Sequence, residues 1–282
     1  MAEDRSRWFV ATDWLADHLD DPEVVVVDGS WHLPGTRDVR AEYAAAHIPG
    51  AVFFDIDAVA DTADPLPHML PSPEQFAAAV GALGIDETRK IVVYDCVGLA
   101  SAPRVWWTFR IMGARDVVIL EGGLPKWQAE GRPVDDRPAS PAPRTFQAAL
   151  QPGAVSDLAA VRANLESHGF QLVDARPRAR FLGEAPEPRS WVKPGRVPGS
   201  LSLPSGEVVE AGTLKDADAL RAAIAAAGID LSRPVVTSCG SGVNAAILTL
   251  ALDTLGMPSA IYDGSWTEWG GRDDTPIATG PA

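Results

Sequence analysis

The stretch Val235-Val236-Thr237-Ser238-Cys239-Gly240-Ser241-Gly242-Val243-Asn244-Ala245 decides the fold class of this chain. Its β-branched run predicts a buried strand that ends at Cys239, and a Gly-rich turn then leads into an apolar helix over residues 246–252. A strand, a tight turn and a helix in this order indicate an α/β fold with a parallel sheet. Open sheets of this kind bind ligands beyond the carboxyl ends of their strands, and Cys239 is expected at such an end.

Cys239 is predicted to be a reactive thiol. The turn places it at the bottom of a loop whose backbone N–H groups point inward, at the positive end of a helix. Such surroundings favour thiolate, the reactive form of cysteine, and Gly240 and Gly242 let the chain curl around the sulfur. The alternative is a buried, inert cysteine at a strand end, which is common. The Gly-x-Gly sequence directly after the cysteine favours the functional interpretation.

The composition argues against several classes of function. A formal net charge of −14 without a basic stripe argues against a nucleic-acid partner. The acidic N-terminus, residues 1–4, is unlike a secretory signal, and no apolar run is long enough to span a bilayer. The only two cysteines, Cys96 and Cys239, do not form the pattern of a secreted disulfide scaffold. We therefore expect a reduced, cytoplasmic protein with no membrane partner.

The second half of the chain repeats landmarks of the first half in the same order, at an offset of roughly 142 to 149 residues. The matched segments are 24–28 with 171–174, 47–51 with 196–200, 91–96 with 234–239, and 121–127 with 263–269. This order predicts two homologous domains, over residues 1–135 and 156–282. Residues 136–155, which begin in a Pro-rich stretch, are predicted to be the linker.

Each half alternates short β-branched segments with helical ones. Ser72-Pro73-Glu74-Gln75 combines an N-cap, a Pro at the first helical position and a capping-box Gln, so it predicts a helix that stops at Gly84. The other predicted elements are strands 91–94, 117–120, 234–237 and 260–262, and helices 102–112, 124–130, 217–227 and 243–255. Strands that alternate with helices predict a parallel sheet covered on both faces in each half.

Six groups of motifs are spread over nearly the whole chain. They are 47–51 with 53–57, 67–71, 101–107, 180–181 with 186–189, 239–243, and 262–266 with 268–269. With these motifs the chain resembles the tandem-domain rhodanese family, and within it the branch whose sulfur donor is 3-mercaptopyruvate. The thiosulfate-preferring branch usually carries basic residues just after the cysteine, whereas this loop is small and neutral. Thiosulfate:cyanide sulfur transfer is the alternative activity.

The resemblance implies a sulfur transfer in which Cys239 becomes a persulfide. The small-molecule donor loses pyruvate, and a thiol or cyanide takes the outer sulfur in a second half-reaction. The acceptor suggested by the family is thioredoxin, and a small thiol fits equally well. Neither a metal nor an organic cofactor is implied. Consistent with that, the other histidines lack metal-ligand spacing with one another or with the cysteines; they are His18, His32, His47 and His168.

The resemblance also implies a proton relay of Ser241, His68 and Asp57. In such a relay the Asp orients the His and the His polarises the Ser. Ser241 shares the cysteine loop, while His68 and Asp57 come from the first half, so the resemblance implies a site between the domains. The structural alternative for His68 is a residue of a Pro-rich turn. Asp55 and Asp61 are nearby alternatives to Asp57.

Two arginines are implied to bind the donor. Arg is the best side chain for gripping a planar carboxylate with two hydrogen bonds, and the family pattern gives this role to Arg180 and Arg189. The alternative is that both are surface residues of a Pro-rich loop. The loop residues expected around the donor are Gly240, Gly242, Val243 and Asn244.

Three positions require comment against the family pattern. Asn244 stands where the family usually has Thr, and Arg196 where it usually has His. Cys96 matches Cys239 in the repeat, but its loop has a single glycine and is more apolar. We interpret Cys96 as a relic, because the first domain of tandem rhodaneses is normally inactive.

Two other functions compete with sulfur transfer. A cysteine phosphatase needs Arg six residues after the cysteine, but that position is Ala245 after Cys239 and Ala102 after Cys96. A non-catalytic rhodanese module used for binding typically lacks the cysteine, which this chain retains.

Overall fold

The computed structural model describes residues 5–281. The chain forms two compact units. The first unit comprises residues 5–62, 70–151 and 211–213, and the second comprises residues 63–69, 152–210 and 214–281.

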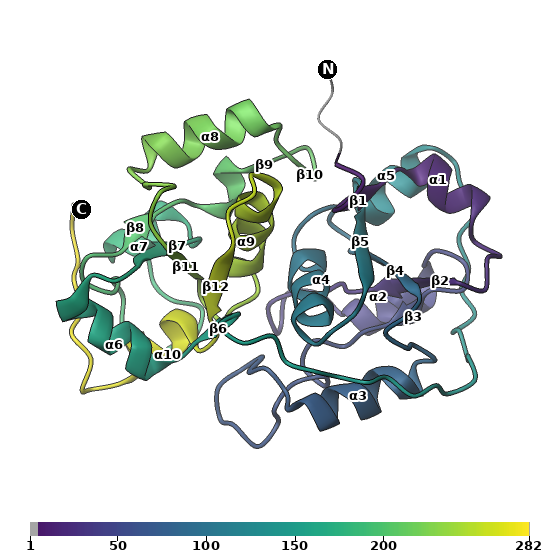
Figure 1. Ribbon diagram of the computed structural model, residues 1–282, viewed down its shortest axis with the longest axis horizontal. Helices are drawn as coiled ribbons and strands as arrows, with labels where there is room; N and C mark the ends of the chain where they lie inside the picture. Colours follow the sequence, from purple (N-terminus) through teal and green to yellow (C-terminus); the bar gives the residue numbers. More distant parts are fainter. Residues whose placement is uncertain (1–4, 282) are drawn as a thin grey trace. The chain divides into compact units, whose positions relative to one another are not determined.

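The first unit contains a five-stranded sheet in the order β1-β5-β4-β2-β3, and its neighbouring strands are parallel. The strands are β1 (Phe9–Val10), β2 (Val24–Asp28), β3 (Val52–Phe53), β4 (Lys90–Tyr94) and β5 (Asp116–Leu120). The helices are α1 (Thr12–Asp17), α2 (Val39–Ala45), α3 (Pro73–Ala82), α4 (Ala102–Ile111) and α5 (Gly123–Ala129) (Figure 1).

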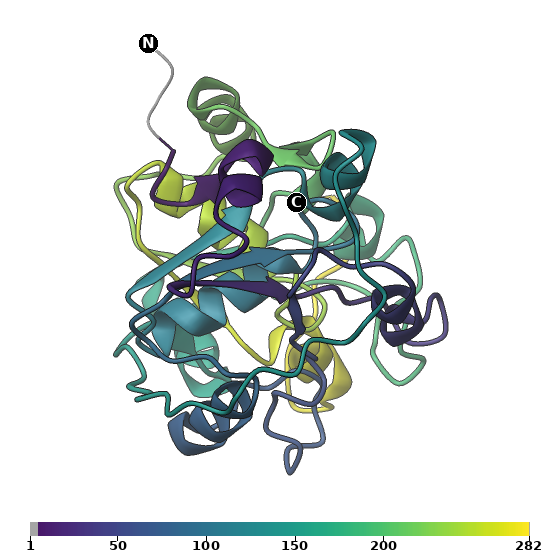
Figure 2. The same cartoon turned by 90° about the vertical axis from the view of Figure 1, so that its right-hand side faces the viewer.

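Helices cover both faces of this sheet. Alternate residues of the central strands pack with Leu15 of α1 and Trp127 of α5 on one face. On the other face, Phe76 of α3 and Phe109 of α4 contact each other edge to face, with their ring centroids 5.3 Å apart. Figure 2 shows α1 (purple) and α3 (blue) on opposite sides of the strands of this unit. Because helices cover both faces, nearly every residue of the central strands is buried, which explains why β-branched residues dominate these strands.

The second unit repeats this architecture with a five-stranded sheet in the order β6-β12-β11-β7-β8, again with parallel neighbours. The strands are β6 (Val155–Ser156), β7 (Gln171–Asp174), β8 (Leu201–Ser202), β11 (Val235–Ser238) and β12 (Ser259–Tyr262). The helices are α6 (Leu158–Ser167), α7 (Arg178–Leu182), α8 (Ala217–Ala226), α9 (Ala245–Thr254) and α10 (Ser265–Gly271). A 3-10 turn (Ser205–Glu207) and the short strands β9 (Val209–Glu210) and β10 (Thr213–Leu214) follow β8.

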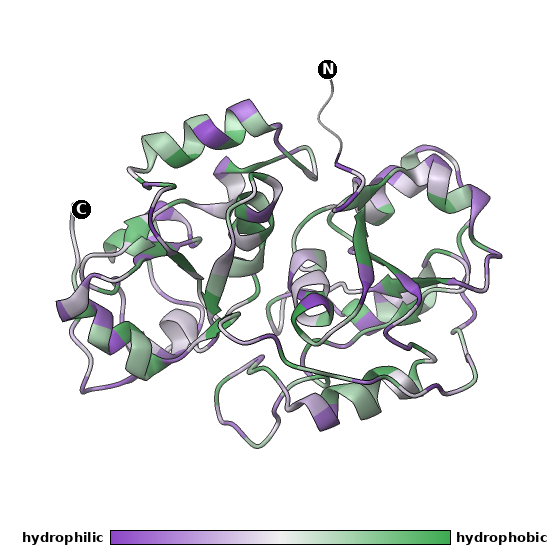
Figure 3. Cartoon of the chain, in the orientation of Figure 1, coloured by the Kyte–Doolittle hydropathy of each residue, from purple (hydrophilic) through white to green (hydrophobic). Residues whose placement is uncertain are grey.

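The two sheets correspond strand by strand. β1, β5, β4, β2 and β3 occupy the same order as β6, β12, β11, β7 and β8. Even the isolated bridge between His47 and Asp135 has a counterpart between Arg196 and Ala278. The central strands of both units are mainly hydrophobic (Figure 3). The prediction of two tandem domains, each with a parallel sheet flanked by helices, is confirmed.

The predicted linker begins as a strap on the first unit. The backbone N–H of Arg144 donates to the carbonyl of Gly81 at 2.9 Å, and Phe146 is 3% exposed in an edge-to-face contact with Phe76. A Cβ on Gly81 would lie 2.5 Å from the Arg144 carbonyl oxygen, so the close approach requires glycine. Residues 136–151 therefore belong to the first unit, and the chain enters the second unit at Pro152.

No helix in residues 5–281 has the length and apolar character needed to cross a membrane.

Candidate active site

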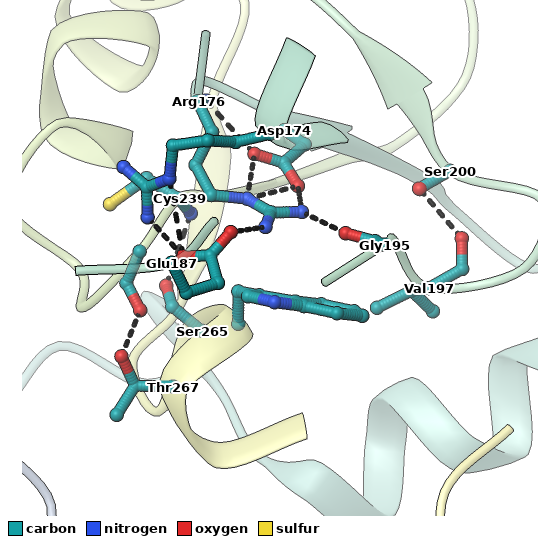
Figure 4. Close-up of polar contacts among 12 residues, drawn as sticks. Asp174, Arg176, Glu187, Gly195, Val197, Ser200, Cys239, Ser265 and Thr267 are labelled. Atoms are coloured by element: carbon teal, nitrogen blue, oxygen red, sulfur yellow. Dashed lines mark hydrogen bonds and ion pairs between the residues drawn. The ribbon is translucent and has the colours of Figure 1, made fainter. Parts of the chain in front are cut away.

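Cys239 directly follows β11, at the carboxyl end of the sheet, and is 3% exposed. Its N–H donates to Ser265 Oγ at 3.2 Å, and its carbonyl accepts from the N–H of Trp266 at 3.0 Å. The carbonyl of Gly240 accepts from the N–H and Oγ1 of Thr267, at 2.8 and 2.5 Å (Figure 4). The first turn of α10 therefore holds the thiol loop through its backbone.

The loop after the thiol presents backbone donors. Within residues 5–281, the N–H groups of Gly240, Ser241 and Val243 donate no hydrogen bond to the chain itself. The side chains of Ser241 and Val243 are buried, and Gly242 has φ of +80°, which glycine adopts without strain. Asn244 precedes α9 and makes no side-chain cap. Backbone N–H groups that lie in a turn before a helix and have no acceptor there can bind an anion.

The matching loop of the first unit is filled by its own carboxylate. Asp95, fully buried after β4, accepts five backbone N–H groups of the loop at 2.7 to 2.9 Å. The donors are Val97, Gly98, Ala100, Ser101 and Ala102. Burial, with the nearby Asp95 charge, raises the pKa of the Cys96 thiol to about 11. Ser238 stands where Asp95 stands in the repeat, so the Cys239 loop lacks a carboxylate at this position.

Arg180 lies beside the thiol loop. A Cβ on Gly240 would be 3.3 Å from Arg180 Nη2, so the guanidinium packs against a loop residue that has no side chain. Arg180 Nε donates to Glu187 Oε2 at 3.2 Å, and its Nη2 forms an ion pair with the same oxygen. The Arg180 side chain is 21% exposed, so it can still bind a small anion.

A buried ionic network fixes Glu187. Arg176 Nη1 donates to Glu187 Oε1 at 2.8 Å, and its Nη2 donates to Asp174 Oδ2 at 2.7 Å and to the carbonyl of Gly195 at 2.8 Å. The Arg176 guanidinium also stacks on the Trp266 ring, 4.5 Å from its centroid. Burial would lower the pKa of Arg176, but the two carboxylates outweigh it and raise that pKa. The sequence does not indicate this network, because nothing in it shows that Glu187 bridges two arginines.

His68 and Asp57 are in different units. His68 is 5% exposed with φ of +62°, in the segment 63–69 that groups with the second unit, as Cys239 does. Asp57 belongs to the first unit, where its Oδ2 accepts from Trp31 Nε1 at 3.0 Å. The alternative Asp55 is already engaged by Arg40 and by two backbone N–H groups.

The remaining predicted positions lie in two places. Arg189 is half-buried in the loop after α7, where its carbonyl accepts from the N–H of Val192 at 3.0 Å. Arg196 is buried away from the thiol loop: Nη1 donates to the carbonyl of Gly280 at 2.7 Å, and the guanidinium stacks on Phe181. Arg196 therefore ties down the C-terminal segment.

A family model described as a rhodanese-like domain matches residues 11–130 and 157–272. The chain belongs to the rhodanese family. It is 45% identical to the 3-mercaptopyruvate sulfurtransferase of Escherichia coli K12, over 96% of this chain and 98% of the relative. It is 44% identical to the thiosulfate sulfurtransferase of Bos taurus, over 93% of this chain and 92% of the relative. The crystal structure of SseA from Escherichia coli superposes with a TM-score of 0.85 at 44% identity, covering 92% of this rhodanese and 98% of SseA.

Proposed function

We infer that this rhodanese transfers sulfur from 3-mercaptopyruvate, through a Cys239 persulfide, to a thiol or to cyanide. The observation that carries this inference is the Cys239 loop, in which the N–H groups of Gly240, Ser241 and Val243 are open to an anion, while five N–H groups of the Cys96 loop donate to Asp95. The relatives named 3-mercaptopyruvate sulfurtransferase, at 45% identity in Escherichia coli and 41% in Homo sapiens, support the same activity.

In the first half-reaction, the Cys239 thiolate attacks the sulfur of the donor. A sulfur–sulfur bond forms, the carbon–sulfur bond breaks, and its electron pair leaves on carbon as the enolate of pyruvate, which then takes a proton. The loop N–H groups hold the anionic sulfur before and after the attack. In the second half-reaction, an acceptor thiolate or cyanide takes the outer sulfur and regenerates the Cys239 thiolate. Two half-reactions through a covalent intermediate give ping-pong kinetics.

Arg180 is proposed to bind the donor carboxylate. Its Nη2 lies beside Gly240 in the thiol loop, and the pairing of Nε and Nη2 with Glu187 fixes the orientation of the guanidinium. A planar guanidinium can grip a carboxylate with two hydrogen bonds. Arg189 is proposed as the second donor-binding arginine, and the backbone of residues 240–244 as the wall around the donor sulfur.

The proton of the enolate is proposed to come through Ser241, His68 and Asp57. Ser241 is two residues after the thiol and buried, which suits a hydroxyl that delivers a proton close to the reacting sulfur. In this relay His68 exchanges the proton with Ser241, and Asp57 orients the imidazole.

The charge near the thiol favours 3-mercaptopyruvate over thiosulfate. The residues at 240–245 are uncharged, and the one arginine placed beside them shares a carboxylate with Arg176. A dianionic donor needs more positive charge than a monoanionic one. Thiosulfate remains the second candidate donor, because the thiosulfate sulfurtransferase of Bos taurus is 44% identical to this chain.

The acceptor is proposed to be a thiol, either that of thioredoxin or a small one. Both cysteines are free thiols, so we propose a reducing compartment, the cytoplasm, as the setting. The test is thiocyanate formation from cyanide with each donor, using wild type, Cys239→Ser and the matched control Cys96→Ser. We expect a preference for 3-mercaptopyruvate that disappears in Cys239→Ser and survives in Cys96→Ser. A preference for thiosulfate would overturn the donor, and activity that survives Cys239→Ser would overturn the nucleophile.

A further inference from the structure

Three metal-ligating side chains converge in the first unit, around the cysteine that sulfur transfer does not use. His32 Nε2, Glu42 Oε2 and Cys96 Sγ all lie within 4.8 Å of one another. His32 follows β2, Glu42 lies in α2 and Cys96 follows β4, so the fold brings together positions that are far apart in the sequence. Each offers one ligand atom of a type that binds transition metals.

The Cys96 sulfur and the Glu42 carboxylate both contact Nε2 of His32. Cys96 Sγ is 3.3 Å and Glu42 Oε2 is 3.2 Å from His32 Nε2. A single imidazole nitrogen carries either one proton or one lone pair, so it cannot serve both neighbours fully. A divalent cation between the three atoms would serve all of them at once.

The observed distances suit a tetrahedral ion. Zinc bonds of about 2.0–2.1 Å to nitrogen or oxygen and about 2.3 Å to sulfur place neighbouring ligand atoms roughly 3.3–3.6 Å apart. The separations of 3.3 Å for sulfur and nitrogen and 3.2 Å for nitrogen and oxygen are already close to these values. The third separation, between Cys96 Sγ and Glu42 Oε2, is within 4.8 Å.

The surrounding groups support the carboxylate and the thiol. Arg37 donates to Glu42 Oε1 at 2.6 Å and to Oε2 at 2.8 Å, so it can keep Oε1 while Oε2 turns to a cation. Such outer hydrogen bonds are usual for metal-bound carboxylates. The backbone N–H of Cys96 is held by Ser30 Oγ at 2.9 Å, which fixes the position of the thiol.

We propose that His32, Glu42 and Cys96 bind a divalent ion of the zinc class, with water as the fourth ligand. The mixed nitrogen, sulfur and oxygen set selects against magnesium and calcium, which prefer oxygen ligands alone. The His32 and Glu42 side chains are 10% and 31% exposed, so the cluster is partly accessible to solvent. This site is independent of the proposed sulfur transfer, because its thiol is not the proposed nucleophile.

The chain allows a direct test, because it contains only two cysteines. Cobalt(II) is the probe, since a bound thiolate gives it a charge-transfer absorption band in the near ultraviolet. In Cys239→Ser, that band can come only from Cys96. We expect one cobalt ion per chain with the band in Cys239→Ser, competed away by zinc, and no band in Cys96→Ser.

His32→Gln and Glu42→Gln, each in the Cys239→Ser background, should weaken cobalt binding by at least about tenfold. The matched control is His168→Gln, an exposed histidine of the second unit, which should change nothing. Circular dichroism checks that each variant is folded. Absence of the band in folded Cys239→Ser, or unchanged affinity in His32→Gln, would overturn the proposal.

A measurement on wild type does not depend on any variant. Zinc should protect Cys96 from iodoacetamide, as judged by mass spectrometry of the peptide that contains it. Alkylation of Cys96 at the same rate with and without zinc would overturn the site.

Discussion

Replacing Ser238, the residue before Cys239, with aspartate should lower the reactivity of the Cys239 thiol. In the first unit, the carboxylate at the matching position accepts hydrogen bonds from the loop N–H groups. Ser238→Asp copies the position of Asp95, whose two oxygens accept five backbone N–H groups of the matching loop. Ser238 is itself buried, so the new carboxylate has to seek the same donors. The variant should then fold with the loop N–H groups bound to the new carboxylate, so that they no longer stabilise the Cys239 thiolate.

The size of the effect follows from the donors lost. Hydrogen bonds to a charged group contribute about 1.5–3 kcal/mol each. If the thiolate loses the N–H groups of Gly240 and Ser241, the loss is about 3 kcal/mol or more, which is at least about 100-fold in rate. The negative charge of the new carboxylate adds to this loss, because it repels both the thiolate and the anionic donor.

The assay is the rate of thiocyanate formation with 3-mercaptopyruvate, together with the rate of Cys239 alkylation by iodoacetamide. Both rates should fall by at least about 100-fold in Ser238→Asp. The matched control, Ser238→Asn, has nearly the same shape without the charge and should lose much less. A folded Ser238→Asp variant with rates within a few-fold of wild type would refute the role given to the open N–H groups.

Three further outcomes follow from the structure. Glu187→Gln removes the charge that fixes Arg180, so KM for 3-mercaptopyruvate should rise by about tenfold, more than kcat falls, in steady-state kinetics; an unchanged KM would count against Arg180 as the donor-binding residue. Burial raises the pKa of the Cys96 thiol to about 11. The rate of Cys96 alkylation in metal-free Cys239→Ser should therefore increase about tenfold per pH unit between pH 7 and 10. A rate that reaches a plateau near pH 8 would contradict the raised pKa. Phe146→Ala empties an aromatic cluster and should lower the free energy of unfolding by about 3–5 kcal/mol in urea titrations, whereas a loss below about 1 kcal/mol would show that the strap contributes little.

The fold could be predicted from the sequence because its signals are local and repeated. β-branched runs mark the long central strands, and the capping box of Ser72 and Gln75 is present as predicted. Helix α9 begins at Ala245, two residues after the predicted start at Val243, because the Gly-rich turn continues through Asn244. The edge strands β1, β3, β6 and β8 are two residues long, too short to give a periodic pattern.

Only part of the candidate site could be predicted from the sequence. The position of Cys239 after a strand was predictable, since a strand followed by a Gly-rich turn is a local pattern. The bridge from Arg176 through Glu187 to Arg180 depends on how the loop after α7 folds back, which no spacing reveals. The difference between Asp95 and Ser238 was visible in the aligned repeats, but its meaning depends on which N–H groups face the carboxylate.

The cluster of His32, Glu42 and Cys96 shows the same limit of sequence spacing. Metal-ligand motifs are recognised when the ligands are close in the chain, and here they are not. The parallel sheet brings the ends of β2 and β4 side by side, which places His32 near Cys96.

The most direct test of the account is the mass of the two cysteine peptides after wild-type protein reacts with 3-mercaptopyruvate in the absence of an acceptor. Rapid alkylation and proteolysis should show one added sulfur atom on the Cys239 peptide and none on the Cys96 peptide. Subsequent cyanide should remove that sulfur as thiocyanate. Added sulfur on Cys96 instead, or pyruvate release with no sulfur on Cys239, would contradict the account.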